Sequence, residues 1–232
     1  MDERKIIVRG ILSGVGLFVL AVTALSRLGL VEVGLPRDGG TFFWQFSRAS
    51  GATATLSLSL LVAFGLLVST GVADRIVPRG RSMEMHQFLS TLTLSLVLAH
   101  AFALAFDGWA RFDVLDVLVP FASPYRPAAV ALGVFALHAS VLVHVSPKLR
   151  KRIGARGFRI LHVLSFPAFF LAVGHALLAQ SDSASWFMRV FLGACVALVL
   201  WLVFYRVFRA WAEARTRMSE PSPTLLPRSN QR

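Results

Sequence analysis

Six long apolar segments separated by short polar stretches dominate this chain. They run over about residues 8–28, 50–72, 84–106, 127–146, 157–179 and 187–208. Each segment holds about 20 residues or slightly more, which as an α-helix is enough to cross the hydrocarbon core of a bilayer. The pattern therefore predicts an all-α integral membrane protein, a bundle of six transmembrane helices.

Two shorter regions complete the predicted topology. Residues 112–119 mix apolar and acidic side chains at helical spacing, which predicts a short helix along the outer membrane surface. An aromatic belt is expected at the same surface, formed by Phe42, Phe43, Trp44 and Trp109. After residue 210 the chain becomes polar and contains several prolines, so residues 1–210 are expected to form the membrane domain and 211–232 a disordered cytoplasmic tail.

Composition agrees with a membrane protein and excludes several functions. Of 232 residues, 56% are hydrophobic and 16% are charged, and the mean hydropathy is +0.66. The single cysteine, Cys195, lies in an apolar segment, which excludes a disulfide, an iron–sulfur cluster and a cysteine-bound zinc within one chain. The net charge of +12 indicates topology and lipid contact in such a chain. We therefore expect the lipid bilayer, and no nucleic acid, as a partner.

The basic residues predict the orientation in the membrane. With six crossings, 18 of the 24 lysine and arginine residues fall on one side, and the other six fall opposite, among acidic residues. Because basic residues collect on the cytoplasmic side, both termini are expected inside, in a multi-pass protein of the plasma or inner membrane. The first segment follows Arg4, Lys5 and Arg9 and also resembles a signal peptide, but we expect it to be retained.

All six histidines lie within or at the ends of predicted spans, where an ionisable side chain indicates a function. His86 and His100 are 14 residues apart on the third span, and His162 and His175 are 13 apart on the fifth. Both spans run outward, so His86 should lie level with His162 near the cytoplasm, and His100 level with His175 near the outer face. Two imidazoles at one depth can be axial ligands of a haem iron, so two levels predict two haems between the third and fifth helices.

The two spacings differ in how well they suit an α-helix. Fourteen residues return to within about 40° of the starting face, whereas thirteen miss it by about 140°. The fifth span must therefore deviate from an ideal helix or present its histidines from different edges. Pro167, between His162 and His175, lacks a backbone donor and can supply this deviation.

The sequence leaves other roles for the histidines open. A histidine in a membrane helix often forms a hydrogen bond to a neighbouring helix instead of binding a metal. A zinc site is disfavoured because each depth offers two ligands and the nearest carboxylates, Glu84 and Asp107, lie at span ends. His138 is expected to form a hydrogen bond within the bundle, with a third redox or proton-relay role as the alternative. His144, close to Lys148, is expected to face solvent or lipid.

The four paired histidines and their surroundings resemble the ferric reductase-like transmembrane domain. This domain is shared by NADPH oxidases, iron reductases and the haem subunit of a bacterial methionine sulfoxide reductase. The resemblance covers about residues 42–180 and includes the histidine spacings and the motifs Ser47-Arg48-Ala49-Ser50, Met85-His86-Gln87, Ser123-Pro124-Tyr125-Arg126-Pro127 and Arg159-Ile160-Leu161-His162. It implies a two-haem cytochrome b in which His86 and His162 bind the inner haem and His100 and His175 the outer haem.

The resemblance also implies residues around the haems. Haem propionates need basic partners at the membrane edges. Arg48 and Arg126 are the outer candidates, and the inner candidates are Arg81, Arg156 and Arg159. Positive-inside bias alone can explain the inner set, and an ordinary topology role remains open for the outer two. Phe169, between the haem levels, is a candidate edge for electron passage, with a plain core aromatic as the alternative.

These features predict a transmembrane oxidoreductase, or the membrane haem subunit of one. Electrons would pass from a cytoplasmic flavoprotein or reduced flavin to an extracytoplasmic acceptor such as ferric iron or oxygen. No Gly-x-Gly-x-x-Gly fingerprint occurs, so flavin would come from a partner or from the free pool. One alternative is a quinol-fed haem subunit that supplies a periplasmic reductase partner. Another is a membrane scaffold or transporter whose histidines relay protons or bind a metal.

Overall fold

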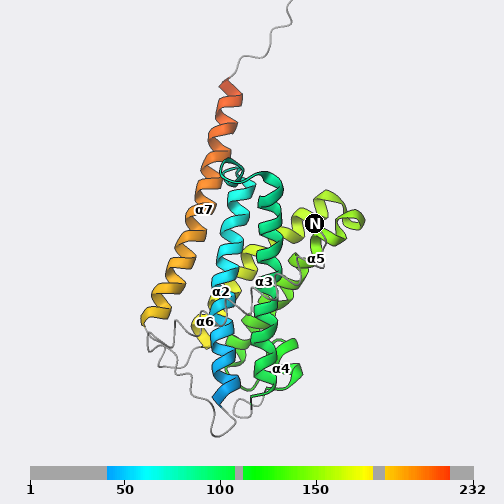
Figure 1. The fold of residues 1–232 in the computed structure, drawn as a ribbon, viewed down its shortest axis with the longest axis vertical. Coiled ribbons are helices and arrows are strands. Elements are labelled where there is room, and N and C mark those ends of the chain that lie inside the picture. The colour runs from blue at the N-terminus through cyan, green and yellow to red at the C-terminus, as the bar shows by residue number, and fades with distance from the viewer. Residues whose placement is uncertain (1–40, 108–111, 180–185, 220–232) are drawn as a thin grey trace, which may run out of the picture.

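Helices make up almost all of the part of the chain that the structure describes. The computed structural model describes residues 41–107, 112–179 and 186–219. In these ranges the elements are α2 (Thr41–Ser69), the 3-10 helix η1 (Ala73–Arg75), α3 (Arg79–Ala105), α4 (Val114–Leu118), α5 (Pro127–Val163), α6 (Ser165–Ala179) and α7 (Trp186–Ser219), with no strand among them (Figure 1). The apolar segment expected at 8–28 and the belt residue Trp109 lie outside the described residues.

Four helical runs in the described ranges are long and apolar enough to cross a membrane, judged by length and composition. They are Phe42–Ser69, Arg79–Ala105, Pro127–Ala179 and Trp186–Thr216. Many large apolar side chains on these runs are exposed, for example Phe102, Ile160 and Phe204, with exposed fractions of 68%, 63% and 68%. Water disfavours such extensive apolar exposure, whereas hydrocarbon accommodates it. The described ranges are therefore those of a membrane protein, and they are helical throughout apart from short turns.

The run Pro127–Ala179 folds back on itself at Gly154. Gly154 has φ 70° and ψ 176°, outside the helical region, and its positive φ suits a residue without Cβ. The two arms pack as antiparallel neighbours, since Nδ1 of His175 in α6 lies 2.8 Å from O of Ala129 near the start of α5. In Figure 1, α5 leads to a projecting turn at the upper right, and the chain returns through α6. The residues expected to link the fourth and fifth apolar segments are thus helical on both sides of one turn.

The central helix of the bundle is α2, which packs on α3, α6 and α7. Its C-terminal half forms an apolar cluster with α6 and α7, in which Phe169 and Val199 are completely buried. Its remaining part carries many small and hydroxyl side chains, which let neighbouring helices approach closely. Oγ of Ser57 lies 2.8 Å from Oγ1 of Thr93 and so links α2 to α3 by a hydrogen bond.

Two helices extend beyond the ranges that the sequence predicts. α2 begins at Thr41, nine residues before the predicted span. The polar side chains in this stretch are accommodated within the helix, as where Oγ of Ser50 donates to O of Phe46 at 2.7 Å. α7 continues to Ser219, so residues 211–219, expected in the disordered tail, are helical. Arg209 Nη1 donates to O of Thr70 at 2.6 Å and ties this part of α7 to the end of α2. Residues 220–232 lie outside the described part.

The short helix expected within 112–119 is confirmed as α4. Its first residue, Val114, follows Asp113, whose Oδ1 accepts a hydrogen bond from the Val114 N–H at 2.6 Å. Oδ2 of Asp116 accepts from the Asp113 N–H at 2.8 Å and completes a capping box. Leu115 and other apolar side chains of this segment are exposed, as a helix along a membrane surface requires.

Candidate functional site

Four histidines face one another in two pairs between α3 and the returning arm of α5 and α6. The ring centres of His86 on α3 and His162 near the end of α5 lie 6.1 Å apart, and we name these residues the α5 pair. The ring centres of His100 on α3 and His175 on α6 lie 6.0 Å apart, and we name these the α6 pair. These are the pairs that the sequence spacing predicts.

The helical arm that carries His162 and His175 is interrupted between them. α5 ends at Val163 and α6 begins at Ser165. Pro167 has no N–H to donate to the carbonyl oxygen of Val163, so the i to i−4 ladder lacks a bond at this point. The predicted deviation from an ideal helix is confirmed, and it lets two histidines 13 residues apart both face α3.

The separation within each pair suits two imidazoles on opposite sides of one metal ion. With nitrogen–metal bonds of about 2.0 Å and about 1.2 Å from each nitrogen to its ring centre, the two ring centres would lie about 6.4 Å apart. The observed 6.1 and 6.0 Å are close to this value. In the described ranges, no group of three or more histidine, cysteine or acidic side chains could hold a metal ion. Two ligands are what a porphyrin-bound iron needs, because the porphyrin supplies the other four nitrogens.

Both histidines of the α6 pair are fixed by hydrogen bonds to main-chain carbonyls. Nδ1 of His100 donates to O of Ser47 at 2.7 Å, and Nδ1 of His175 donates to O of Ala129 at 2.8 Å. A carbonyl oxygen can only accept, so the proton of each neutral ring is on Nδ1 and Nε2 has a free lone pair. Metal binding through Nε2 requires this tautomer, and the same bond fixes the orientation of the ring.

The α5 pair is held by different contacts. Nδ1 of His86 and Nδ1 of His162 are buried and have no hydrogen-bond partner in the part of the chain that the structure describes. The ring of His162 stacks on that of Phe158, one helical turn earlier, with ring centres 5.1 Å apart and an angle of 27° between the planes. The two pairs therefore differ in what orients their rings.

Glycines on α2 and α5 let three of the four rings approach a helix backbone. A Cβ atom at Gly51 would lie 2.8 Å from Nδ1 of His100, too close for a normal contact. A Cβ atom at Gly133 would lie 2.8 Å from Nδ1 of His175. At a third glycine, Gly65, a Cβ atom would lie 3.0 Å from Cε1 of His86. The absence of a side chain at these positions therefore gives the rings their space.

Sequence interpretation missed these glycines, although a signal was present. Gly51 and Gly65 are 14 residues apart on α2, the same spacing as His86 and His100 on α3. The two helices are antiparallel neighbours, so Gly51 meets His100 and Gly65 meets His86. The shared 14-residue spacing of the glycines and the histidines would have predicted both contacts, provided that α2 and α3 were taken to be adjacent.

A cavity of about 280 Å³ lies beside the α6 pair. His100 and His175 line it together with mostly small and apolar residues of α2 to α7, and Asp116 of α4 is also part of the lining. Arg48 and Tyr125 line the same cavity, and the side chain of Arg48 is exposed. An apolar lining that includes an exposed basic residue suits a planar apolar group that carries carboxylates.

The arginines expected near a cofactor have different surroundings. Arg48 lies about two turns into α2 and does not open the helix as predicted, because α2 starts at Thr41. Arg126 precedes α5 with a left-handed φ of 42°, and its Nη1 donates to O of Leu178 at 2.9 Å, which joins the start of α5 to the end of α6. At the opposite end of the bundle, the three inner candidates, Arg81 on α3 and Arg156 and Arg159 on α5, are exposed.

Phe169 lies within the apolar cluster of α2, α6 and α7 and is completely buried. This placement agrees with the interpretation of Phe169 as a core aromatic. A role as an edge for electron passage stays a prediction.

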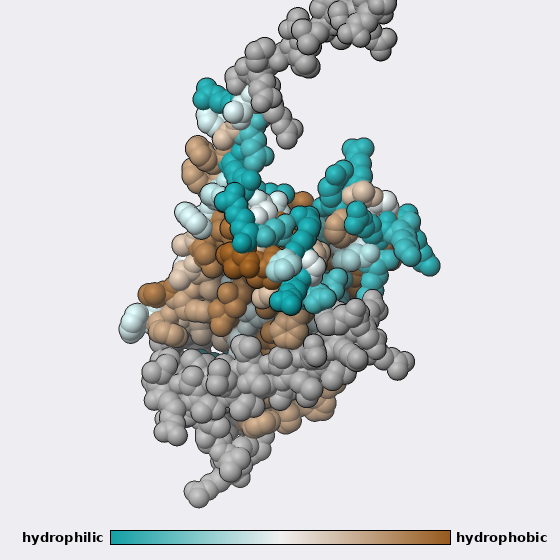
Figure 2. All heavy atoms as spheres, turned by 45° about the horizontal axis from the view of Figure 1, so that its top comes forward, coloured by the Kyte–Doolittle hydropathy of each residue, from teal (hydrophilic) through white to brown (hydrophobic). Residues whose placement is uncertain are grey.

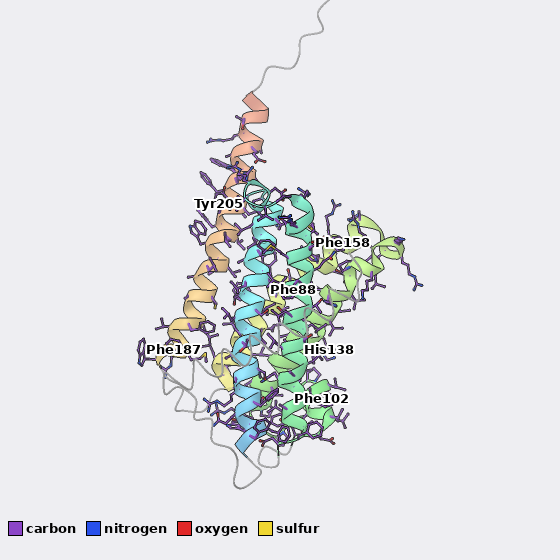
Figure 3. The ribbon with its side chains drawn as sticks, in the orientation of Figure 1. Phe88, Phe102, His138, Phe158, Phe187 and Tyr205 are labelled. Carbon is purple, nitrogen blue, oxygen red and sulfur yellow. The ribbon has the colours of Figure 1, made fainter. Side chains whose placement is uncertain are left out.

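The expectation for His144, to face solvent or lipid, was wrong, whereas that for His138 holds only in part, because His138 forms a hydrogen bond but within its own helix and on an exposed face. His144 is half-buried, and its Nδ1 lies at hydrogen-bond distance, 2.9 Å, from Oγ of Ser90 on α3. His138, labelled in Figure 3, is exposed, and its Nδ1 donates to O of Val134 on its own helix at 2.8 Å. The rotation of α5 explains both positions. Around the axis of α5, His144 lies only about 20° from Gly133, which faces the α6 pair, so it lies on the same face. His138 lies about 140° from Gly133 and so is on the other side of the helix.

Fold and site together define an all-helical membrane protein with two facing histidine pairs at two levels of the bundle. No family model, curated protein or solved structure matches the chain.

Proposed function

We propose that this protein is a transmembrane di-haem cytochrome b of the ferric reductase-like type. The observation that carries the proposal is the separation of 6.1 and 6.0 Å between the ring centres of two histidine pairs, which suits bis-imidazole ligation. His86 and His162 would hold one haem and His100 and His175 the other, through Nε2 in each case. When bound, two b haems supply one-electron carriers at two depths of the bilayer.

The other residues of the site would orient the ligands and enclose the cofactors. The carbonyl oxygens of Ser47 and Ala129 keep the Nδ1 protons of the α6 pair in place, so that Nε2 points its lone pair away from the supporting helices. The glycines behind the rings prevent a clash with α2 and α5. Arg48, on the cavity lining, would pair with a haem propionate through a charge-assisted hydrogen bond.

The proposed topology has six crossings with both termini in the cytoplasm. Because the run Pro127–Ala179 reverses at Gly154, it would cross twice, which gives five crossings with the other described helices. The apolar segment 8–28 would supply the sixth.

The distribution of basic residues supports the orientation. Hydrophilic side chains gather over the projecting turn of α5 in Figure 2, and the exposed basic residues of this turn are Lys148, Arg150, Lys151, Arg152 and Arg156. By the positive-inside rule this end would face the cytoplasm of a plasma or inner membrane. The α5 pair would then be the inner haem site and the α6 pair the outer one.

The proposed activity is electron transfer from a cytoplasmic flavoprotein or reduced flavin to an extracytoplasmic acceptor such as ferric iron or oxygen. The exposed basic residues of the projecting turn offer an acidic donor a docking surface close to the inner site. A quinol-fed haem subunit of a periplasmic reductase would use the same two haem sites with another donor and partner, so the identity of the electron donor distinguishes the two.

The haem-to-protein ratio, measured together with the visible spectrum, tests the proposal. Protein purified after expression with added haem should contain two haems per chain and show a sharp low-spin Soret band. The variant His138→Ala is a matched control, because His138 is exposed on the far side of α5 and its loss should leave the haem content unchanged. A wild-type protein without haem would contradict the proposal and favour a scaffold or transporter whose histidines relay protons or bind another metal.

A further inference from the structure

The ligands of the two proposed haem sites are oriented by different means. In the outer pair, each Nδ1 donates to a main-chain carbonyl oxygen. In the inner pair, Nδ1 of His86 and of His162 are buried without such an acceptor among the described residues. A metal-bound histidine usually relies on a partner at its second nitrogen to fix the plane of its ring. Something else must therefore fix the ring of His162.

Phe158 is the residue in position to do so. It precedes His162 by four residues on the last part of α5, and its ring stacks on the imidazole with 5.1 Å between centres and 27° between planes. Side chains four residues apart lie on the same face of a helix, so the stack is built into the helical repeat. Figure 3 shows Phe158 toward the projecting turn of α5.

Arg150 extends this arrangement to the surface. Its guanidinium carbon lies 5.4 Å from the centre of the Phe158 ring, within the range of a cation–π interaction. Arg150 and Phe158 come from opposite sides of the reversal at Gly154, so the fold-back itself brings them together. The positive charge of Arg150 is thus separated from the ring of His162 by the ring of Phe158 alone.

We infer that Phe158 is a positioning residue for His162 and that Arg150 is the charged group that tunes the inner haem through this stack. The inference rests on the proposed function, because it concerns a haem ligand. Phe158 fixes the plane of the imidazole by ring contact, in the role that the carbonyls of Ser47 and Ala129 have in the outer pair. Arg150 favours the reduced state of the inner haem, since reduction removes one positive charge from the iron.

The first test uses Phe158→Leu in the full haem-loaded chain. Leucine keeps an apolar side chain but removes the flat face, so the angle between the planes of His86 and His162, 56° in the structure, is no longer fixed. We expect the electron paramagnetic resonance signal of the oxidised inner haem to shift or broaden, and its midpoint potential to change. The outer haem should keep its signal and potential.

Two further variants separate positioning from general packing. Phe158→Tyr retains the flat ring and should restore the wild-type signal and potential of the inner haem. Phe166→Leu is the matched control, because Phe166 follows His162 by four residues but packs on the apolar cluster of α2, α6 and α7. Loss of the inner haem alone in Phe158→Leu, with recovery in Phe158→Tyr, would also support the inference. An unchanged inner signal in Phe158→Leu, or equal changes at both haems, would overturn it.

The second test compares Arg150→Ala with Arg152→Ala. Both arginines are exposed on the projecting turn and both changes remove one positive charge, but the contact with Phe158 is made by Arg150. The midpoint potential of the inner haem should fall more in Arg150→Ala than in Arg152→Ala. Equal shifts would show that the turn acts only through its total charge and would refute the role of Arg150. A wild-type chain without haem would instead refute the proposed function itself.

Discussion

His100 and Ser47 are joined by two reciprocal hydrogen bonds across α2 and α3. Nδ1 of His100 donates to O of Ser47 at 2.7 Å, and Oγ of Ser47 donates to O of His100 at 3.2 Å. The side chain of each residue thus contacts the main chain of the other. Because α2 is the central helix of the bundle, this link fixes both the height and the orientation of the His100 ring, a ligand in the proposed outer haem site.

If the four paired histidines bind haem as proposed, their replacement should show two independent pairs. His100→Ala or His175→Ala should reduce the haem content from two to about one per chain by removing the outer haem, since a b-type iron needs both axial ligands for its low-spin state. His86→Ala or His162→Ala should remove the inner haem instead. Redox titration checks which haem is lost, because each haem has its own midpoint potential. Loss of the same haem from all four variants would refute the pairing.

The glycine contacts predict a graded series of alanine variants. Gly51→Ala places a methyl group 2.8 Å from Nδ1 of His100, and Gly65→Ala places one 3.0 Å from Cε1 of His86. Overpacking of this kind costs about 1–3 kcal/mol. We expect Gly51→Ala to lower the haem content and the thermal midpoint most, because the ring of His100 cannot move without losing its bond to Ser47.

Gly193 on α7 provides the control for that series. An added Cβ there meets no atom within 4 Å, so Gly193→Ala should not destabilise the protein and, by its higher helix propensity, should stabilise it by up to about 1 kcal/mol. Thermal unfolding followed at the Soret band and by helical circular dichroism measures both effects. If Gly51→Ala and Gly193→Ala had the same haem content and thermal midpoint, the His100 ring would not need the space that Gly51 leaves beside α2.

Arg48 should affect the outer haem selectively. It lines the cavity of the α6 pair, and loss of a positive charge near a propionate favours the oxidised iron. Arg48→Ala should therefore lower the midpoint potential of the outer haem and leave that of the inner haem unchanged. Arg189→Ala is a suitable control, since Arg189 is exposed at the start of α7. Identical titrations of wild type and Arg48→Ala would leave Arg48 with a topology role.

The hydrogen bond between His144 and Ser90 should contribute modestly to the stability of the bundle. Bonds of this type in membrane proteins contribute about 0.6 kcal/mol on average. His144→Leu and Ser90→Ala should each destabilise the protein, and the double variant should be less destabilised than the sum of the two. A double-mutant cycle of unfolding in detergent measures this coupling. Additive effects would show that the bond across α3 and α5 contributes nothing.

The pairing of the histidines could be predicted from the sequence because it depends on depth alone. Depth follows from residue number along a helix axis, and the directions of the third and fifth apolar segments were enough to match His86 with His162 and His100 with His175. The interruption of the arm near Pro167 could be predicted for a similar reason, since a 13-residue spacing on an ideal helix cannot present both rings to one neighbour.

The rotation of each helix about its axis could not be predicted in the same way. Which face of α5 is buried depends on the contacts of Gly133 and Ala129 with His175, and these contacts exist only in three dimensions. For this reason His144 was expected to face solvent or lipid, and the exposed position of His138 was not predicted. Hydropathy could not locate the start of α2 either, because the hydroxyl groups near Ser50 look like a polar boundary but are satisfied within the helix.

The last prediction is that this 232-residue chain does not oxidise NADPH by itself. It contains no nucleotide-binding fingerprint, and the connections at the proposed cytoplasmic end, around Ala73–Arg75 and Gly154, are too short to fold into such a domain. For the proposed function, electrons would then reach these 232 residues from a donor outside them, which could be a flavoprotein, free reduced flavin or quinol. Stopped-flow mixing of the purified haem protein with each donor checks this. NADPH alone should leave the haems oxidised, and adding a flavin reductase with flavin should reduce the inner haem first. Rapid reduction by quinol would identify the quinol-fed alternative, and rapid reduction by NADPH with no other component would defeat the prediction.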